Sequence, residues 1–346
     1  MALASRQVEL DRFPSTRLQA SDFRLSEVVL PELGPGQVLV RNTWTSVDPG
    51  MRLRLEAMGH RGYFQPFPLH AALDGIMTVG VVVDSRAPGF APGDHVSHAL
   101  GWRDFSIVEA GVPALSGLGT LSLLDTSIAP AQTFLGVLGA AGITAYVGLV
   151  HAGELRDGDV VWVSAGAGAV GSLAVQFAKL CGHVVVASAG SDEKVAYLRD
   201  ELGVDAAFNY HAGRVADLLA DAAPNGIDLY FDNVGGDHLE AALSTLRRWG
   251  RVALCGAISD YESGAERVGP RNLFEATAND LTLRGFRGSS YLDRRDEVDR
   301  EVGTWMRDGR LRHRETVYDG LERAPQAMVD MLAGGTIGKT LVHISD

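Results

Sequence analysis

The sequence predicts an α/β protein in which a β-barrel domain is followed by a doubly wound parallel sheet. Residues 1–125 read as short alternating strands broken by turn residues. From residue 126 onward, helix-length apolar segments alternate with short β-branched runs, a pattern typical of parallel strands covered by helices on both faces. With 346 residues, of which 46% are hydrophobic, the chain is long enough to build two cores.

The N-terminal section is expected to be entirely β. Residues 23–50 alternate apolar and polar side chains and are interrupted by two turn sequences, Leu33-Gly34-Pro35-Gly36 and Asp48-Pro49-Gly50. Residues 75–110 continue the same alternation. Short strands that follow one another across such turns indicate a small barrel.

The second section is expected to hold six parallel strands with helices between them. The strands are predicted at 160–164, 183–187, 206–210, 227–232, 251–255 and 281–286. Apolar residues recur at i, i+4 and i+7 in the helical segments, as Leu173, Phe177 and Leu180 and again as Leu239, Leu243 and Leu246. Six strands with intervening helices form the doubly wound fold that binds dinucleotides.

The C-terminal residues are expected to contain one more helix, near Ala324–Leu332, and a final strand in residues 338–345. Because six strands already account for the parallel sheet, we expect this last strand to return to the N-terminal β domain. The predicted domains are therefore 1–130 with 313–346, and 131–312.

The first predicted parallel strand is followed by a glycine-rich loop and then by a helix. Gly166, Gly168 and Gly171 have the spacing Gly-x-Gly-x-x-Gly, and a second strand follows about a dozen residues later, as a βαβ unit requires. Gly166 is expected to permit the tight turn, Gly168 to let the backbone approach a pyrophosphate, and Gly171 to let the helix pack closely. The sequence thus predicts a Rossmann domain whose helix N-terminus faces the anion.

The end of the second strand indicates which dinucleotide is bound. Proteins that bind NAD carry Asp or Glu about 20 residues past the glycine loop, to hold the ribose hydroxyls. Residues 187–191 contain no carboxylate here, and Lys194 follows closely enough to neutralise a 2′-phosphate. Asp192 is expected to cap the helix that begins there. These features favour NADP(H).

Three further loops follow the later strands: Asn209-Tyr210, Asp232–Gly236 and Cys255–Tyr261. Each is polar or glycine-rich and comes directly after an apolar run. Because ligands bind at the carboxyl ends of parallel strands, we expect these loops to line one edge of the sheet.

Motifs spread through most of the chain resemble those of the zinc-free medium-chain dehydrogenase/reductases, and within them the leukotriene B4 dehydrogenase, prostaglandin reductase and alkenal double-bond reductase group. They are SVDPGMR (46–52), GDHV (93–96), GWRDF (101–105), GITAYVGL (142–149), AGAGAVGS (165–172), GSDEK (190–194), FDNVGG (231–236), GRVALCGAIS (250–259) and GKTLV (338–342). The resemblance implies a GroES-like barrel, a Rossmann domain and a substrate cleft between them. It also implies reduction of the C=C bond of α,β-unsaturated aldehydes and ketones with NADPH, by a homodimer joined through the sheet edge near 281–286.

By position in the family, the resemblance implies which residues form the site. Those at the cofactor are Gly166, Gly168, Ala169, Val170 and Gly171 at the pyrophosphate, Lys194 and Tyr210 at the adenosine phosphate, and Asn233, Cys255, Gly256, Ile258, Ser259, Tyr261, Phe286, Gly288 and Thr336 on the ribose and nicotinamide side. Those at the substrate are Trp44, Met51, Arg52, Tyr63, Phe64, Trp102 and Tyr291. Gly50 replaces the tyrosine of the family's usual VDPYMR, which is expected to widen the cleft.

No metal is expected, so a side chain must stabilise the charge that develops in the reaction. The zinc enzymes of the superfamily carry Cys and Gly-His-Glu where this chain has Ser46 and Leu73-Asp74-Gly75. Hydride addition to the β-carbon of an enone leaves an enolate oxygen, which a preorganised hydrogen-bond donor stabilises. Tyr261 is the candidate donor, and it is also a candidate general acid for the α-carbon.

Composition excludes several other functions. Lys and Arg number 31 against 43 Asp and Glu, a net charge of −12, which disfavours nucleic acid as a partner. The charged N-terminal residues do not form a signal peptide, so a cytoplasmic protein is expected. The uncharged segment 134–150 is shorter than the roughly 20 residues that span a membrane. A quinone oxidoreductase and an NADPH-binding protein without catalysis are the alternatives.

Overall fold

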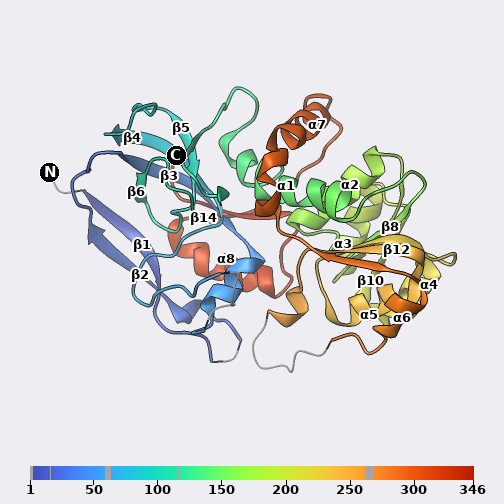
Figure 1. Ribbon diagram of the computed structural model, residues 1–346. Helices are drawn as coiled ribbons and strands as arrows, with labels where there is room; N and C mark the ends of the chain where they lie inside the picture. The colour runs from blue at the N-terminus through green and yellow to red at the C-terminus, as the bar shows by residue number, and fades with distance from the viewer. Residues whose placement is uncertain (1–2, 16, 59–63, 115–116, 262–268) are drawn as a thin grey trace. The chain divides into compact units, whose positions relative to one another are not determined.

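The structure is a computed structural model that describes residues 3–15, 17–58, 64–114, 117–261 and 269–346. The chain forms two compact units. Unit 1 consists of Met1–Ala140 and Glu315–Asp346, and unit 2 consists of Ala141–Arg314. Unit 1 therefore contains both ends of the chain, whereas unit 2 is continuous (Figure 1).

Unit 1 is built on a mixed sheet, whose strands follow the order β14-β15-β3-β4-β5-β7, while β6 pairs with β3. Their bounds are β3 Gln37–Val47, β4 Thr78–Ser85, β5 His95–His98, β6 Phe105–Glu109, β7 Ser122–Leu123, β14 Glu315–Asp319 and β15 Lys339–His343. A separate antiparallel pair is formed by β1 (Ala4–Leu10) and β2 (Phe23–Val29). The all-β prediction for this part of the chain is confirmed.

The C-terminal elements belong to unit 1, as the sequence indicates. The predicted helix is α8 (Ala324–Leu332), and β15 pairs antiparallel with β3, with Leu341 opposite Ser46. Met328 of α8 is completely buried beside Leu10 and Val342 in the main core of this unit. The strand β14, which pairs parallel with β15, was not expected from the sequence, because its residues ETVYD carry charges at both ends.

Unit 2 contains a six-stranded parallel sheet in the order β10-β9-β8-β11-β12-β13. The bounds are β8 Val160–Val163, β9 Val184–Ala189, β10 Ala206–Asn209, β11 Ile227–Asp232, β12 Leu246–Leu254 and β13 Thr282–Gly285. The strand order runs outward from β8 in one direction and from β11 in the other, which is the doubly wound arrangement. The predicted fold class and the six predicted strands are confirmed.

Helices cover both faces of this sheet. The helices of the unit are α1 Ala140–Val147, α2 Ala169–Leu180, α3 Asp192–Ala196, α4 Val215–Ala222, α5 Gly236–Thr245, α6 Phe274–Ala278 and α7 Arg295–Arg307. Figure 1 shows α1, α2 and α7 on one side of the strands, and α4, α5 and α6 on the other. The strands are buried between them, and Val161, Phe231 and Val252 have no exposed surface.

One residue of the predicted helical pattern belongs to a strand. Leu246 continues the spacing of Leu239 and Leu243, but α5 ends at Thr245 and β12 begins at Leu246. The backbone of Leu246 is extended, with φ −63° and ψ 132°, and its side chain is still buried. The expectation was wrong because β12 starts immediately after α5, and its first side chain is buried on the same side as the apolar residues of the helix. Periodicity alone therefore does not mark where the helix ends and the strand begins.

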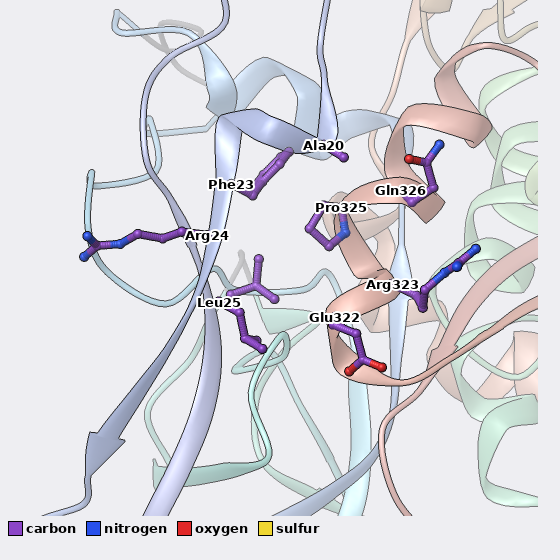
Figure 2. A pocket seen from close by; sticks show the side chains of 9 residues that line it. Ala20, Phe23, Arg24, Leu25, Glu322, Arg323, Pro325 and Gln326 are labelled. Atoms are coloured by element: carbon purple, nitrogen blue, oxygen red, sulfur yellow. The ribbon is translucent and has the colours of Figure 1, made fainter.

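Unit 1 has a hollow of about 300 Å³ between β2 and the start of α8 (Figure 2). Its walls include Phe23, Leu25 and Pro325, and the charged ends of Arg24 and Arg323 point away from it. No residue that the sequence predicts to bind cofactor or substrate lines this hollow. It is therefore separate from the candidate site described below.

Candidate nucleotide-binding and active site

The candidate site lies at the carboxyl ends of the parallel strands of unit 2. The strands end at Val163, Ala189, Asn209, Asp232, Leu254 and Gly285. The cofactor residues predicted in this unit all follow one of these ends, and the parallel order of the sheet brings those ends to one edge. In open α/β sheets this edge is where ligands bind, at the point where the strand order reverses. Here that point lies between β8 and β11.

The glycine loop after β8 makes a sharper turn than expected at Ala165. Ala165 has a left-handed backbone, with φ +47°, whereas Gly166 does not. Gly166 donates its N–H to the carbonyl of Ser188 at 2.9 Å, which ties the loop to β9. A Cβ on Gly166 would lie 3.0 Å from the Cβ of Ala187. Gly166 lies in the turn as expected, and it is also needed for space beside β9.

Gly171 packs against the loop as its spacing indicates, whereas the role of Gly168 at a pyrophosphate stays a prediction. A Cβ on Gly171 would lie 2.2 Å from the carbonyl oxygen of Ala165, so only glycine lets α2 start this close to the loop. A Cβ on Gly168 would meet only that same oxygen, at 3.2 Å, and its other side is open. The amides of Ala169, Val170 and Gly171 head the helix, where no carbonyl of the helix can accept them. These open amides fit a pyrophosphate.

Lys194 lies in α3, beyond the end of β9. Its backbone N–H donates to the Ser191 hydroxyl oxygen at 3.3 Å, so Ser191 and not Asp192 caps the helix. Ser191 has the extended backbone of a cap, whereas Asp192 is the first helical residue and accepts from Asn209 at 2.8 Å. The Lys194 side chain is half-buried, and this burial lowers the pKa of its ammonium group.

The ends of β9 and β10 meet at Gly190 and Tyr210. A Cβ on Gly190 would lie 2.8 Å from the Tyr210 hydroxyl oxygen, so the phenol lies directly on the backbone of Gly190. The His238 ring contacts Tyr210 edge-on, with 5.1 Å between ring centroids. The two residues predicted around the adenosine phosphate, Lys194 and Tyr210, therefore follow the ends of β9 and β10. Residues 187–191 contain no carboxylate, and the Asp192 carboxylate beside them is bonded to Asn209.

Asn233 follows β11 and is tied to the end of β8. Its N–H donates to the Ser164 hydroxyl at 3.0 Å, and its side-chain Nδ2 donates to the Ser164 carbonyl at 2.7 Å. The Nδ2 group is engaged in this way, so the side-chain oxygen Oδ1 is the acceptor that Asn233 offers to a ligand. The side chain is half-buried.

The loop after β12 is hydrogen-bonded to the loop after β11. The amides of Cys255 and Gly256 both donate to the carbonyl of Asp232, at 2.9 and 3.0 Å. The amides of Ile258 and Ser259 donate to the next two carbonyls of the first loop, each at 3.2 Å. Burial raises the pKa of the Cys255 thiol to about 12, so this cysteine stays protonated near neutral pH.

Tyr261 ends the short helical turn of that second loop. Its hydroxyl oxygen accepts the N–H of Ala257 at 3.4 Å, and its own N–H donates to the carbonyl of Ile258 at 3.2 Å. A Cβ on Gly256 would lie 3.2 Å from the same hydroxyl oxygen. The phenol therefore lies against Gly256, two residues after the end of β12. This loop is the one that the sequence predicts for the nicotinamide side.

The segment after β13 packs on α1 and on β11. The Phe286 ring meets Phe231 edge-on, with centroids 6.0 Å apart, and a Cβ on Gly288 would lie 2.5 Å from the Thr144 hydroxyl oxygen. Tyr291, a predicted substrate residue, is stacked on His151 at 5.9 Å. Phe286 and Gly288 follow the strand end as predicted.

The remaining predicted residues lie in unit 1. Met51 and Trp102 have no exposed surface and belong to the hydrophobic core, and Arg52 is 1% exposed. Trp44 of β3 lies against His343 with 4.4 Å between ring centroids. Thr336 is buried and accepts a hydrogen bond from Thr340 at 3.1 Å. Their substrate and cofactor roles stay predictions.

Gly50 and the predicted aromatic residue Phe64 also belong to unit 1. A Cβ on Gly50 would lie 3.7 Å from the ring of Phe64, so that ring stands beside the position where the family's motif has tyrosine. Tyr63, the other predicted aromatic residue here, lies outside the described residues. Whether Phe64 contacts substrate stays a prediction.

Sequence reasoning missed Ser164 and Tyr230, whose hydroxyl groups are hydrogen-bonded to residues of the loop after β11. The Tyr230 hydroxyl oxygen lies 2.9 Å from the Ser164 hydroxyl and 2.7 Å from a carboxylate oxygen of Asp232. The signal was present in the strand itself, because Tyr230 and Asp232 are two residues apart and so point to the same face. Polar residues in an otherwise apolar parallel strand need partners when they are buried.

Within the described ranges, no group of three or more His, Cys, Asp and Glu is arranged to hold a metal ion. No helix in the described part of the chain combines the length and the apolar character needed to cross a membrane.

Comparison with known families agrees with both units. Residues 6–114 match the N-terminal domain of oxidoreductases. Residues 169–302 match the family described as zinc-binding dehydrogenases. This second match covers five of the six strands of the parallel sheet, all but β8, and does not include Ser46 or Asp74, the positions compared above with zinc ligands.

Individual relatives extend over the whole chain. The 2-alkenal reductase (NADP(+)-dependent) of Nicotiana tabacum is 35% identical and covers 99% of this chain and 98% of its own length. Prostaglandin reductase 1 of Mus musculus is 37% identical over 93% of both chains. The crystal structure of CurA from Vibrio vulnificus in complex with NADPH has a TM-score of 0.90, with 32% identity and 99% coverage of both chains. With its GroES-like unit and its Rossmann unit, this chain belongs to the zinc-free medium-chain dehydrogenase/reductases, in the group of the prostaglandin and alkenal reductases.

Proposed function

We propose that this protein reduces the C=C bond of α,β-unsaturated ketones and aldehydes with NADPH. As a member of this family it is an oxidoreductase that uses NADP(H). The names of the tobacco and mouse relatives support the substrate class. The observation that carries the proposal is the phenol of Tyr261, held on the loop after β12 by the amide of Ala257.

The residues of unit 2 fit the cofactor. The amides of residues 169–171 at the start of α2 suit its pyrophosphate, and a Cβ on Gly168 beside them would meet only the Ala165 carbonyl oxygen. Lys194 and Tyr210 would hold the 2′-phosphate at a strand end without a carboxylate, and Asn233 Oδ1 would accept from a ribose hydroxyl. When bound, NADPH supplies the hydride for the reaction.

The protein's contribution is to stabilise negative charge on the substrate oxygen. Addition of hydride to the β-carbon moves an electron pair to the carbonyl oxygen, which becomes an enolate. The Tyr261 oxygen accepts the Ala257 N–H, so this bond does not consume the phenol hydrogen, which is donated to the enolate oxygen. The α-carbon then takes a proton from solvent or from Tyr261 acting as general acid. A homodimer joined along the edge strand β13 is part of the same proposal.

The test follows the loss of NADPH absorbance with a conjugated enone, with a quinone, and with no acceptor. We expect turnover with the enone. Tyr261→Phe should lower kcat by about 10- to 100-fold and leave the KM for NADPH unchanged, because only the donor to the developing charge is lost. Tyr318→Phe is the matched control, since Tyr318 of unit 1 binds Asp330 at 2.7 Å and has no predicted role in the site.

The results with the different acceptors distinguish the proposed function from its two alternatives. Turnover with the quinone alone would identify a quinone oxidoreductase and contradict the proposal. NADPH binding without turnover of either acceptor would indicate a binding protein without catalysis. A Tyr261→Phe variant as active as the Tyr318→Phe control would remove Tyr261 from the mechanism.

A further inference from the structure

The six-stranded sheet divides the cofactor site into two halves. The strands β8, β9 and β10 lie on one side of the reversal point, and β11, β12 and β13 lie on the other. In this fold each half binds one mononucleotide. The glycine loop and Lys194 belong to the first half, so the loops after β11 and β12 face the nicotinamide mononucleotide.

Asp232, the last residue of β11, anchors the first of these two loops through its side chain. The carboxylate is 1% exposed, and its oxygen Oδ1 accepts the amides of Val234 and Gly235 at 2.9 and 2.8 Å. The same oxygen accepts the hydroxyl of Tyr230 at 2.7 Å. A phenol has one hydrogen, and the shorter distance and the carboxylate acceptor favour its donation to Asp232 over the Ser164 oxygen, which is 2.9 Å away.

Asp232 anchors the second loop through its backbone. Its carbonyl accepts the amides of Cys255 and Gly256, which begin the loop that ends at Tyr261. The two loops also touch, because a Cβ on Gly235 would lie 3.1 Å from the Cβ of Ala257. Gly235 has φ +73°, a conformation that glycine adopts without strain. One residue therefore holds both loops of the second half.

The carboxylate has no charged partner to explain its burial. Its second oxygen, Oδ2, is buried and has no hydrogen-bond partner among the described residues, and the described part of the chain provides no cation for it. Burial raises the pKa of this carboxyl group. A buried carboxylate that is not fully paired is costly to keep, so the bonds at Oδ1 must be worth more than this cost.

We propose that Asp232 is a positioning residue for the nicotinamide half of NADP(H), which acts by fixing the loops that carry Asn233 and Tyr261. The inference rests on the NADP(H) part of the proposed function and is independent of the carbonyl substrate. It requires that the two halves of the site respond differently when Asp232 is changed. A purely structural role would affect both halves alike.

Calorimetric titration with two ligands makes this distinction. NADP⁺ occupies both halves, whereas adenosine 2′,5′-bisphosphate occupies only the half with the glycine loop and Lys194. Asp232→Ala leaves two amides and a phenol without their acceptor, and we expect about tenfold weaker binding of NADP⁺. Binding of the bisphosphate should stay within about twofold of wild type, because its contacts come from the other half. Asp232→Asn keeps an oxygen at Oδ1 and should restore NADP⁺ binding to within about threefold.

The matched control is Asp159→Asn, at the other end of the sheet. Asp159 precedes β8, is 6% exposed and forms a buried ion pair with Arg251. Its loss should lower the unfolding temperature and leave the affinities for both ligands unchanged. If Asp232→Ala weakens both ligands equally, or neither, the positioning role is overturned.

Two further results keep the test decisive. If Asp232→Ala does not fold, Asp232→Asn is compared with Tyr230→Phe, which removes one of the three donors. Tyr230→Phe should then weaken NADP⁺ binding by about threefold and leave binding of the bisphosphate unchanged. Wild-type affinity for both ligands, or a loss shared by both, overturns the inference. A protein that shows the expected split but reduces no enone would retain this inference and lose the proposed substrate class.

Discussion

Lys194 is the cation on which the choice of cofactor depends. It is half-buried at the start of α3, and burial lowers its pKa, while the charge of Glu193 opposes this shift. A cation partly removed from water attracts an anion more strongly, because less solvent screens the pair. Residues 187–191, at the end of β9, offer an NAD ribose no carboxylate acceptor, so both effects favour a 2′-phosphate.

Lys194→Ala should therefore reduce the preference for NADPH over NADH. A charge-assisted contact of about 1.5–3 kcal/mol corresponds to roughly a 10- to 100-fold rise in the KM for NADPH, with the KM for NADH unchanged. The measurement is a pair of saturation curves with the two cofactors and one enone. Lys179→Ala is the control, since Lys179 is paired with Asp205 on the surface of unit 2. An unchanged ratio in the Lys194 variant would contradict its role at the phosphate.

The position of α2 next to its preceding loop depends on a single residue, Gly171. Its first turn lies so close to Ala165 that Gly171 has no room for a side chain. The helix α7 offers the opposite case, because a Cβ on Gly303 in its middle would meet no atom within 4 Å. The two glycines belong to the same unit and to helices of similar length, so they form a matched pair.

Gly171→Ala should destabilise the protein and weaken the binding of NADP⁺ and of adenosine 2′,5′-bisphosphate together, because the displaced loop serves both ligands. Gly303→Ala should stabilise it by about 1 kcal/mol, the usual gain from alanine in a helix interior. Urea denaturation and calorimetric titration measure the two effects. A Gly171→Ala protein with wild-type stability and affinity would show that the loop moves away at no cost.

Periodicity and the glycine spacing were enough to predict the parallel sheet and the edge that carries the candidate site. They did not locate Ser191 as the cap of α3, because Ser and Asp are nearly equal as caps and only the backbone conformation distinguishes them. They placed the turn at Gly166 correctly, but they did not indicate that Ala165 is the residue of this turn with a left-handed backbone. The strand β14 was missed because its residues ETVYD carry charges at both ends and give no apolar run like those of the predicted strands.

At the scale of the whole molecule, each unit holds a histidine that is neutral when folded. His98 in unit 1 has no exposed surface, and burial, with a contribution from Arg103, lowers its pKa to about 3. His238 in unit 2 is 5% exposed, and burial lowers its pKa to about 4 against the opposing charge of Asp237. The unfolded chain binds a proton at either residue below about pH 6.5, while the folded chain does not.

Stability should consequently fall as the pH drops from about 6.5 toward 4, by about 1.4 kcal/mol per pH unit for each of these histidines. His238→Phe should reduce this dependence and keep stability at pH 7, because Phe can stack on Trp162 in place of the imidazole. Urea unfolding at pH 7 and pH 5 measures the change. His313→Gln, at an exposed position, is the control, and an equal pH dependence in both variants would contradict the assignment.

Because β15 lies between β14 and β3, the sheet of unit 1 can be completed on the ribosome only after unit 2 has been synthesised. Translation delivers residues 141–314 before 315–346, so the nascent chain can complete unit 2 while residues 3–140 still lack an interior strand of their sheet. A nonsense mutation just before Lys339 would accordingly leave a Rossmann domain attached to an unfinished partner, with its open β-sheet exposed to chaperones and proteases.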